Sequence, residues 1–310
     1  MSTAEPGAER EARGALVTAW SPRNPAAAAA PYQRPAVSWL RLLASEFRLV
    51  FRRRRNLALL GVVAVIHVII GIALRLAAPP TSGGGGQGPP FLDQVAGNGV
   101  FLSFLALTIQ LTLVLPLVVA VAAGDSVAGE AGYGTLRYLL CVPAGRTRLL
   151  GVKYLTVVAF GLVAAGIITS VSLVAGVALF PVGPVTLLSG TSVSLAEGLL
   201  RVLFVTLYVA AAMASLGAIG LAISTFTEHA IGAIAALAII VVASQVGDSV
   251  PQFSVVHPYL PTHWWDSFDS LLRSPVDTTT LTRGLLSFGV YIVVFGAIAW
   301  ARFTSSDVTS

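Results

Sequence analysis

The chain of 310 residues is 55% hydrophobic and only 11% charged, well below the roughly 25% of charged residues in a soluble globular domain. These values exclude an ordinary water-soluble fold and indicate a chain that lies mostly within a lipid bilayer. The single cysteine, Cys141, excludes an internal disulfide, and the net charge of +5 reflects basic residues beside apolar segments rather than a nucleic-acid-binding surface.

Residues 1–35 are rich in Ala, Pro, Arg and Glu and lack the apolar core of a secretory signal, so we predict a disordered cytoplasmic tail. An amphipathic helix is predicted over residues 36–55, because apolar side chains recur there at helical spacing. They are Trp39, Leu40, Leu43, Phe47, Val50 and Phe51, with Arg41, Ser45, Arg48 and Arg52 on the opposite face. Such a helix lies on the inner membrane surface, where it either anchors the chain or braces a cytoplasmic partner.

Six apolar stretches are long enough to cross a bilayer as helices, since about 20 apolar residues span its ~30 Å hydrocarbon core. We predict them at Leu57–Ala78, Gly99–Ala123, Tyr154–Phe180, Val202–Ser224, Ala230–Gly247 and Gly284–Ala301. The predicted fold is therefore an all-α integral membrane protein. Its six-span domain covers residues 56–303 and is followed by a short cytoplasmic tail, residues 304–310.

The distribution of basic residues predicts the orientation of these spans. With both termini in the cytoplasm, eleven basic residues flank the spans on the cytoplasmic side and four on the outside, and cytoplasmic flanks retain Lys and Arg during insertion. The inner set is Arg41, Arg48, Arg52, Arg53, Arg54, Arg55, Arg137, Arg146, Arg148, Lys153 and Arg302, and the outer set is Arg75, Arg201, Arg273 and Arg283.

The connections between spans differ in character. Residues 79–98 are rich in Gly and Pro and predict a flexible external connection, whereas residues 225–229 predict a tight internal turn. The longer external segment, residues 248–283, predicts a short helix dipping into the outer membrane interface, where tryptophan is favoured. Its apolar residues at helical spacing are Trp264, Trp265, Phe268, Leu271 and Leu272.

The cytoplasmic segment between the second and third spans, residues 125–150, combines apolar and basic residues. Leucines precede Pro143, and this order predicts a short amphipathic helix that stops at the proline. The apolar side of such a helix can dock into a groove of a partner, with ion pairs at the rim fixing its orientation.

This segment resembles the coupling loop of type-2 ABC transporter permeases, which has an acidic residue, Gly-Thr-Leu-Arg, a proline, an arginine and a lysine in that order. The matching residues are Glu130, Gly134, Thr135, Leu136, Arg137, Pro143, Arg146 and Lys153. Gly132 departs from the pattern, since many relatives have a second acidic residue there. The span layout, the entry helix and the long external segment are similar too, so the resemblance covers roughly residues 36–305.

The resemblance implies a permease subunit of an ABC exporter that pairs with a second permease, the same or a homologous chain. In that family the loop acts as a coupling helix pressed against a separate ATPase subunit, which holds ATP and Mg. The sequence contains no Gly-x-x-x-x-Gly-Lys-Ser/Thr motif, so we expect no cofactor on this chain and ATP hydrolysis on the partner. The resemblance further implies outward transport in the cell membrane, and the composition suggests a bacterial source.

Polar residues inside predicted spans are candidates for a substrate route, because such groups usually face a bundle interior or a water-filled cavity. The candidates are His67, Gln110, Thr206, Tyr208 and Gln245. Each is weighed against a structural role as a hydrogen-bonding group between helices. His257, His263, Asp266 and Asp269 could together ligate a metal on the outside, but we assign no metal site. The amphipathic pattern already explains His263 and Asp266, and we interpret the external carboxylates as a solvated rim.

Two other classes of function remain as alternatives. A secondary transporter or facilitator without an ATPase fits the composition, although the shortage of intramembrane charges argues against ion coupling. A membrane-embedded enzyme fits less well, because an intramembrane serine protease needs a nucleophile turn and a histidine on another span. The sequence has no Gly-x-Ser-Gly, and His67 is the only histidine within a predicted span.

Overall fold

The computed structural model describes residues 35–77, 98–132 and 145–305. The predicted tail, nearly all of the connection 79–98 and the motif residues Gly134, Thr135, Leu136, Arg137 and Pro143 lie outside the described residues. The chain divides into two units, one that ends at Arg41 and one that runs from Leu42 onward. Helix α2 (Pro35–Arg52) begins in the first unit, and every contact described below belongs to the second.

Six described helices are long and apolar enough to cross a membrane, which confirms the predicted all-α fold with six spans. They are α3 (Arg54–Ala77), α6 (Val114–Gly132), α8 (Arg146–Leu179), α9 (Leu195–Ser224), α10 (Ala230–Ser249) and α11 (Thr278–Ser305). Most extend beyond the predicted bounds, because helices continue past the apolar stretch into the polar flanks. The predicted entry helix is α2, which ends at Arg52 rather than at residue 55.

The second predicted span is not one continuous helix. It consists of α5 (Phe101–Thr112) and α6, with a break at Leu113. Pro116 has no backbone N–H, so the carbonyl of Thr112 loses the donor that a continuous helix would supply. The side-chain amide of Gln245 on α10 donates to this carbonyl instead, at 2.7 Å.

The connection between the second and third spans is shorter than predicted. The sequence predicts a loop over residues 125–132, but these residues form the last two turns of α6. The basic stretch that follows the motif forms the first turns of α8, which begins at Arg146. The prediction ended the second span where hydropathy falls, yet a helix can continue when its polar side chains find partners.

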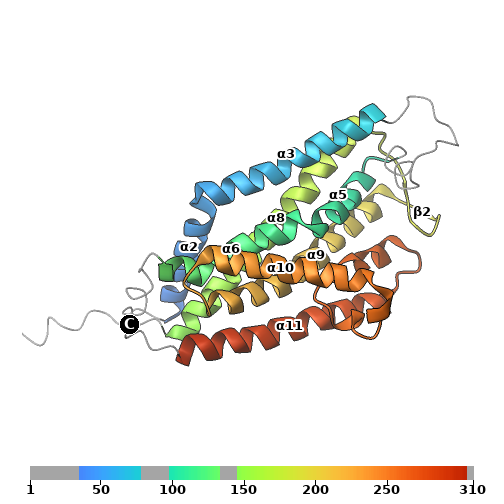
Figure 1. Ribbon diagram of the computed structural model, residues 1–310. Coiled ribbons are helices and arrows are strands. Elements are labelled where there is room, and N and C mark those ends of the chain that lie inside the picture. Colours follow the sequence, from blue (N-terminus) through green and yellow to red (C-terminus); the bar gives the residue numbers. More distant parts are fainter. Residues whose placement is uncertain (1–34, 78–97, 133–144, 306–310) are drawn as a thin grey trace, which may run out of the picture. The chain divides into compact units, whose positions relative to one another are not determined.

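The external segment after α10 differs from the predicted interfacial helix. It consists of the 3₁₀ helices η2 (Pro251–Phe253), η3 (His257–Tyr259) and η4 (Trp265–Leu272). The side chains of Trp265, Phe268 and Leu272 are buried against the helix bundle instead of facing the membrane interface. Between α8 and α9, a small antiparallel hairpin of β1 (Val185–Thr186) and β2 (Ser192–Val193) lies at the same end of the bundle (Figure 1).

Helix α9 is the central helix of the bundle and packs against α6, α8 and α11 (Figure 1). In the apolar 18-residue stretch of α9, 78% is buried inside the protein. The corresponding buried share is 22% for α3 and α10 and 17% for α11. The hydrophobic core therefore sits around α9, and the apolar outer faces of α3, α10 and α11 are suited to contact with lipid.

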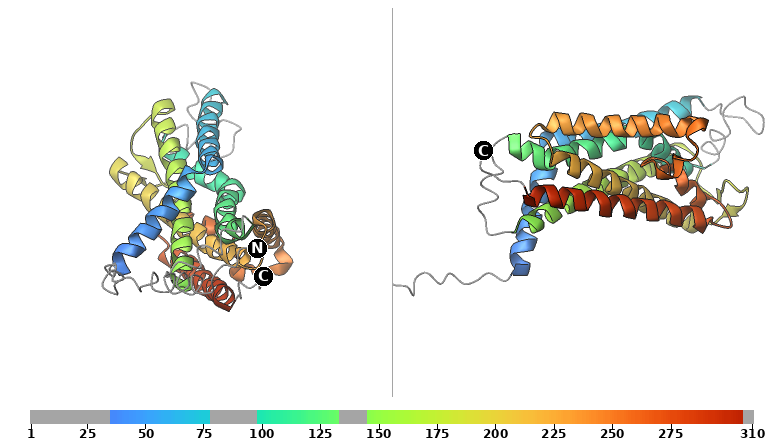
Figure 2. Two further views of the ribbon diagram at one scale, coloured as in Figure 1. Left: turned by 90° about the vertical axis from the view of Figure 1, so that its left-hand side faces the viewer. Right: turned by 60° about the horizontal axis from the view of Figure 1, so that its bottom comes forward.

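From Leu42 on, α2 runs across the bundle helices rather than along them, and the chain turns sharply at Arg53 into α3 (Figure 2). The side-chain amide of Asn56 donates to the carbonyl of Val50 at 3.0 Å, which satisfies one of the last carbonyls of α2. Phe51 packs against Phe160 of α8, with ring centroids 5.5 Å apart. This turn at Arg53, here called the elbow, brings Glu46 of α2 to the ends of α6 and α8.

Candidate functional site

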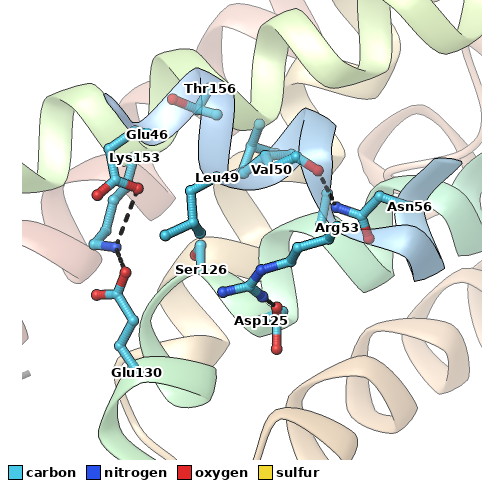
Figure 3. Close-up of a pocket in the computed structure, with 12 residues that line it drawn as sticks. Glu46, Leu49, Val50, Arg53, Asn56, Asp125, Ser126, Glu130, Lys153 and Thr156 are labelled. Atoms are coloured by element: carbon cyan, nitrogen blue, oxygen red, sulfur yellow. Dashed lines mark hydrogen bonds and ion pairs between the residues drawn. The ribbon is translucent and has the colours of Figure 1, made fainter. Parts of the chain in front are cut away.

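One cationic and two anionic side chains meet where α2, α6 and α8 come together. The ammonium of Lys153 lies 2.6 Å from Oε1 of Glu130 and 3.6 Å from Oε2 of Glu46. Lys153 is 2% exposed and each glutamate 7%. Figure 3 shows the lysine pointing between the two carboxylates, each of which comes from a different helix.

The sequence places each member of this triad by its position along a helix. Glu46 lies three residues after Leu43 and four before Val50, and is thus on the apolar face of α2. Glu130 is in the last turn of α6, and Lys153 is two turns into α8. The amphipathic pattern alone missed Glu46, but a carboxylate at an apolar position was the signal that could have found it.

The three side chains of the triad are buried, and ion pairs hold them together. Removing a charged side chain from water costs several kcal/mol, and close opposite charges with good geometry offset this cost. Two carboxylates share one ammonium here, so the loss of Lys153 would leave both buried without their shared partner. We expect this buried ion group to fix the relative register of the three helices that supply it.

A second ion cluster lies beside the triad. Asp125 of α6 is 8% exposed and forms ion pairs with Arg53 at the elbow and with Arg55 of α3, the latter at 3.2 Å. The carboxylate of Asp125 lies over Gly129, one turn further along α6, where an added Cβ atom would overlap it. Glycine at 129 therefore leaves the space in which Asp125 reaches the two arginines.

The two ion clusters share one small cavity of about 20 Å³, which has room for about one water molecule. Its wall includes Glu46, Arg53, Asp125, Glu130 and Lys153 (Figure 3). The cavity is too small for a substrate or nucleotide, so these charges serve to join helices to one another.

The other flank of residues 133–144 is attached to α11. A guanidinium nitrogen of Arg146 donates to the carbonyl of Thr304 at 2.9 Å, and the indole N–H of Trp300 donates to the hydroxyl of Thr147 at 2.9 Å. Of the predicted coupling residues, the structure thus describes Glu130 and Arg146. It places one on each side of the undescribed stretch, and each bonds to a different helix.

The end of α6 is also tied to α9 through Ser224, which the sequence did not single out. Its hydroxyl donates to the carbonyl of Gly124 at 2.9 Å and accepts from the backbone N–H of Ala128, also at 2.9 Å. A serine at the end of an apolar span carries no distinctive sequence signal, because most such hydroxyls bond their own helix.

No hydrogen bond joins any two of the five predicted substrate-route residues, all of which lie in the described part of the chain. The imidazole of His67 contacts the carbonyl of Val63 at 2.6 Å, and the hydroxyl of Thr206 bonds that of Thr169 at 2.9 Å. Gln110 is 1% exposed, and its amide nitrogen has no partner among the described residues. Tyr208 donates to the carbonyl of Trp264 at 2.8 Å, and Gln245 caps Thr112.

The described residues 35–77, 98–132 and 145–305 contain no group of three or more His, Cys, Asp and Glu side chains suited to hold a metal. Among the external residues weighed for one, His263 instead contacts Asp248, with Nδ1 2.6 Å from Oδ1. Asp269 forms an ion pair with Arg273 at 3.2 Å.

Comparison with known protein families gives one match that covers most of the chain. A family model described as "ABC-2 family transporter protein" matches residues 42–245, which run from α2 through most of α10 and include both ion clusters. No curated protein sequence matches the chain.

Proposed function

Because the chain belongs to the ABC-2 transporter family, we propose that it is the membrane-spanning subunit of an ATP-driven exporter. Family membership and the six apolar helices make it a multi-pass membrane permease, a transport subunit that is not itself the ATPase. In the proposal, a separate nucleotide-binding subunit holds ATP and Mg and docks on residues 133–144, between α6 and α8.

The observation that carries this proposal is the anchoring of both flanks of the docking stretch. Glu130 connects the end of α6 to α2 and α8 through Lys153, and Arg146 connects the start of α8 to α11. A displacement of the stretch by a partner therefore acts on four helices at once. Rigid-body movement of packed helices is a common way to open a site alternately to two sides.

The proposal includes a second permease subunit, identical or homologous, and the cell membrane of a bacterium with both termini in the cytoplasm. The basic residues at the α2 end support this orientation. The triad would then lie at the cytoplasmic side and η2 to η4 at the outer side. A facilitator that works without an ATPase remains the second candidate, since the same apolar helices would serve it.

The first test is purification of the tagged chain in mild detergent, followed by mass spectrometry for a protein with a Walker A motif. We expect such a protein at comparable stoichiometry, with ATPase activity. A stable chain that purifies without any ATPase under several mild conditions would favour the facilitator.

A second test addresses coupling within the purified complex. Glu130→Gln should leave the complex assembled but lower ATPase stimulation by transported compounds, because the link from α6 to Lys153 is weakened. Glu228→Gln is the matched control, since Glu228 is exposed in the turn before α10. Equal stimulation in both variants would contradict the role given to Glu130.

A further inference from the structure

The arginines at the elbow between α2 and α3 differ in their partners. Arg53 and Arg55 form ion pairs with Asp125. Arg52, the last residue of α2, and Arg54, the first of α3, are exposed and form no ion pair with any residue that the structure describes. Membrane insertion favours basic residues at this end of the spans, but it does not determine which of them face outward.

A third exposed arginine lies close to this outward pair. Arg48 precedes Arg52 by four residues, so the two side chains are neighbours on one face of α2. Arg48 also has no ion-pair partner in the described part of the chain. Arg54 follows Arg52 by two residues, which keeps their Cα atoms within about 7 Å of each other. The three like charges therefore lie on one short stretch of surface, where they attract an anion.

The nearby carboxylates do not neutralise these three charges, because they are bound to other cations. Glu46 and Glu130 share Lys153, and Asp125 is paired with the two other arginines of the elbow. Figure 3 shows these carboxylates directed toward their own partners. The exposed arginines thus keep an excess of positive charge at the surface of the elbow.

Arg54 lies at the end of a strip of apolar residues on the outer face of α3, which is at the edge of the bundle (Figure 1). The residues of the strip follow Arg54 at intervals of three or four, and all are exposed. They are Ala58, Gly61, Val65, Ile69, Ile72 and Leu76. Residues at this spacing share one face of a helix. Since this face is suited to contact with acyl chains, Arg54 lies at the level of the lipid head groups, where the span begins.

Two exposed leucines lie beside the arginines. Leu49 follows Arg48 on α2, and Leu57 lies in the first turn of α3; they are 43% and 52% exposed. Guanidinium groups beside aliphatic side chains match an amphiphile with an anionic head group better than they match an acidic protein surface. Hydrocarbon can cover the leucines while a phosphate pairs with the guanidinium groups.

We propose that the elbow binds an anionic phospholipid. Its phosphate pairs with Arg48, Arg52 and Arg54, and an acyl chain lies along the apolar strip of α3. Arginine binds phosphate oxygens through two parallel hydrogen bonds, and clusters of basic residues next to a membrane span attract anionic lipids. A zwitterionic lipid has the same phosphate, but its cationic group is repelled by the three arginines.

This proposal goes beyond the proposed function and does not depend on it. It requires only that α3 crosses the membrane, which holds for an exporter and for a facilitator alike. The bound lipid would reduce the repulsion between the arginines of the elbow, and a ligand that binds only the folded state raises its stability. Binding should therefore also raise the melting temperature of the purified chain.

The test is native mass spectrometry of the purified full chain in a nonionic detergent, titrated with dioleoylphosphatidylglycerol. Dioleoylphosphatidylcholine is the control lipid, since it has the same acyl chains and phosphate but no net charge. We expect saturable binding of phosphatidylglycerol that is at least about tenfold tighter than binding of phosphatidylcholine. Each arginine near an anionic lipid contributes about fivefold in affinity, so Arg52→Gln/Arg54→Gln should lose at least about tenfold and Arg48→Gln about fivefold.

The matched control is Arg75→Gln/Arg283→Gln. It removes two exposed arginines from the opposite end of the bundle, Arg75 in the last turn of α3 and Arg283 in the second turn of α11. Its affinity for phosphatidylglycerol should equal that of the unaltered chain. Circular dichroism melting confirms that each variant is folded, and phosphatidylglycerol should raise the melting temperature of the control variant but not that of Arg52→Gln/Arg54→Gln.

Equal affinities for the two lipids, or an unchanged affinity in the folded Arg52→Gln/Arg54→Gln variant, would overturn the proposal. So would an equal loss in the matched control, which would show that net charge alone governs binding. Displacement of the lipid by micromolar glycerol 3-phosphate would assign the elbow to a soluble phosphate instead. The assay needs no ATPase, so lipid binding by a chain without a copurifying ATPase would contradict the proposed function alone. An active ATPase complex that does not prefer phosphatidylglycerol would contradict the lipid site alone.

Discussion

Lys153 forms its shortest ion pair with Glu130, at 2.6 Å, and this contact joins α8 to the last turn of α6. It is the chain's single lysine, and it lies almost wholly out of solvent. The pair therefore connects the helix before the undescribed stretch 133–144 directly to the helix after it. Under the proposed function, coupling as well as stability depends on this contact.

Lys153→Met should destabilise the protein strongly, because two buried carboxylates lose their shared cation. Breaking a buried ion pair from one side costs about 3–5 kcal/mol. The measurement is the free energy of unfolding in mixed detergent micelles. Lys153→Arg keeps the charge and should recover part of the loss, whereas equal stability of the methionine variant and the unaltered chain would refute the structural role of the triad.

Gly176→Ala should also destabilise the protein, because the backbone of α8 at Gly176 lies directly against the backbone of Gly99, just before α5. A Cβ at residue 176 would overlap the carbonyl of Gly99, which cannot move without shifting the start of α5. Overpacking of this kind costs about 1–3 kcal/mol. Gly166→Ala on the same helix is the control, since nothing lies within 4 Å of its added Cβ, and its melting temperature should not fall.

Gln245→Leu should cost about 1 kcal/mol, the net worth of one hydrogen bond, because the carbonyl of Thr112 loses its donor. Pro116→Ala supplies the backbone N–H that is missing at this point of the helix. In the Pro116→Ala background the cost of Gln245→Leu should therefore shrink. Additive effects in this double-mutant cycle would show that the two residues do not compensate for one another.

Gly284→Ala should push the ring of Tyr208 away from α11, since the added Cβ would overlap the tyrosine hydroxyl. We expect a loss of about 1–3 kcal/mol in unfolding free energy. The loss should be smaller in a Tyr208→Phe background, where the hydroxyl is absent. Gly289→Ala on the same helix meets nothing within 4 Å and serves as the control for alanine substitution in α11.

The number and order of the spans could be predicted because each apolar stretch had the length that a bilayer requires. The break at Leu113 was missed although Pro116 stood in the sequence, because proline is tolerated in membrane helices when another group satisfies the freed carbonyl. That group is Gln245, which is distant in sequence. Its identity depended on the packing of α10 against the α5–α6 break.

The candidate site was predictable only in part, because its side chains also come from helices that are distant in sequence. The motif drew attention to Glu130 and Arg146, but it did not indicate that Glu130 would pair with Lys153 and Glu46 inside the protein. Periodicity assigns a residue to a face of its own helix, but not to the helix that covers this face.

The burial of the only lysine has a practical consequence for chemical labelling. Amine-reactive reagents find no accessible side-chain amine on the folded chain, because Lys153 is 2% exposed and no other lysine exists. If the folded chain is labelled and then digested, a modified Lys153 peptide would accordingly report separation of α2, α6 and α8. The rate of this modification would follow the opening of this end of the bundle without any engineered probe.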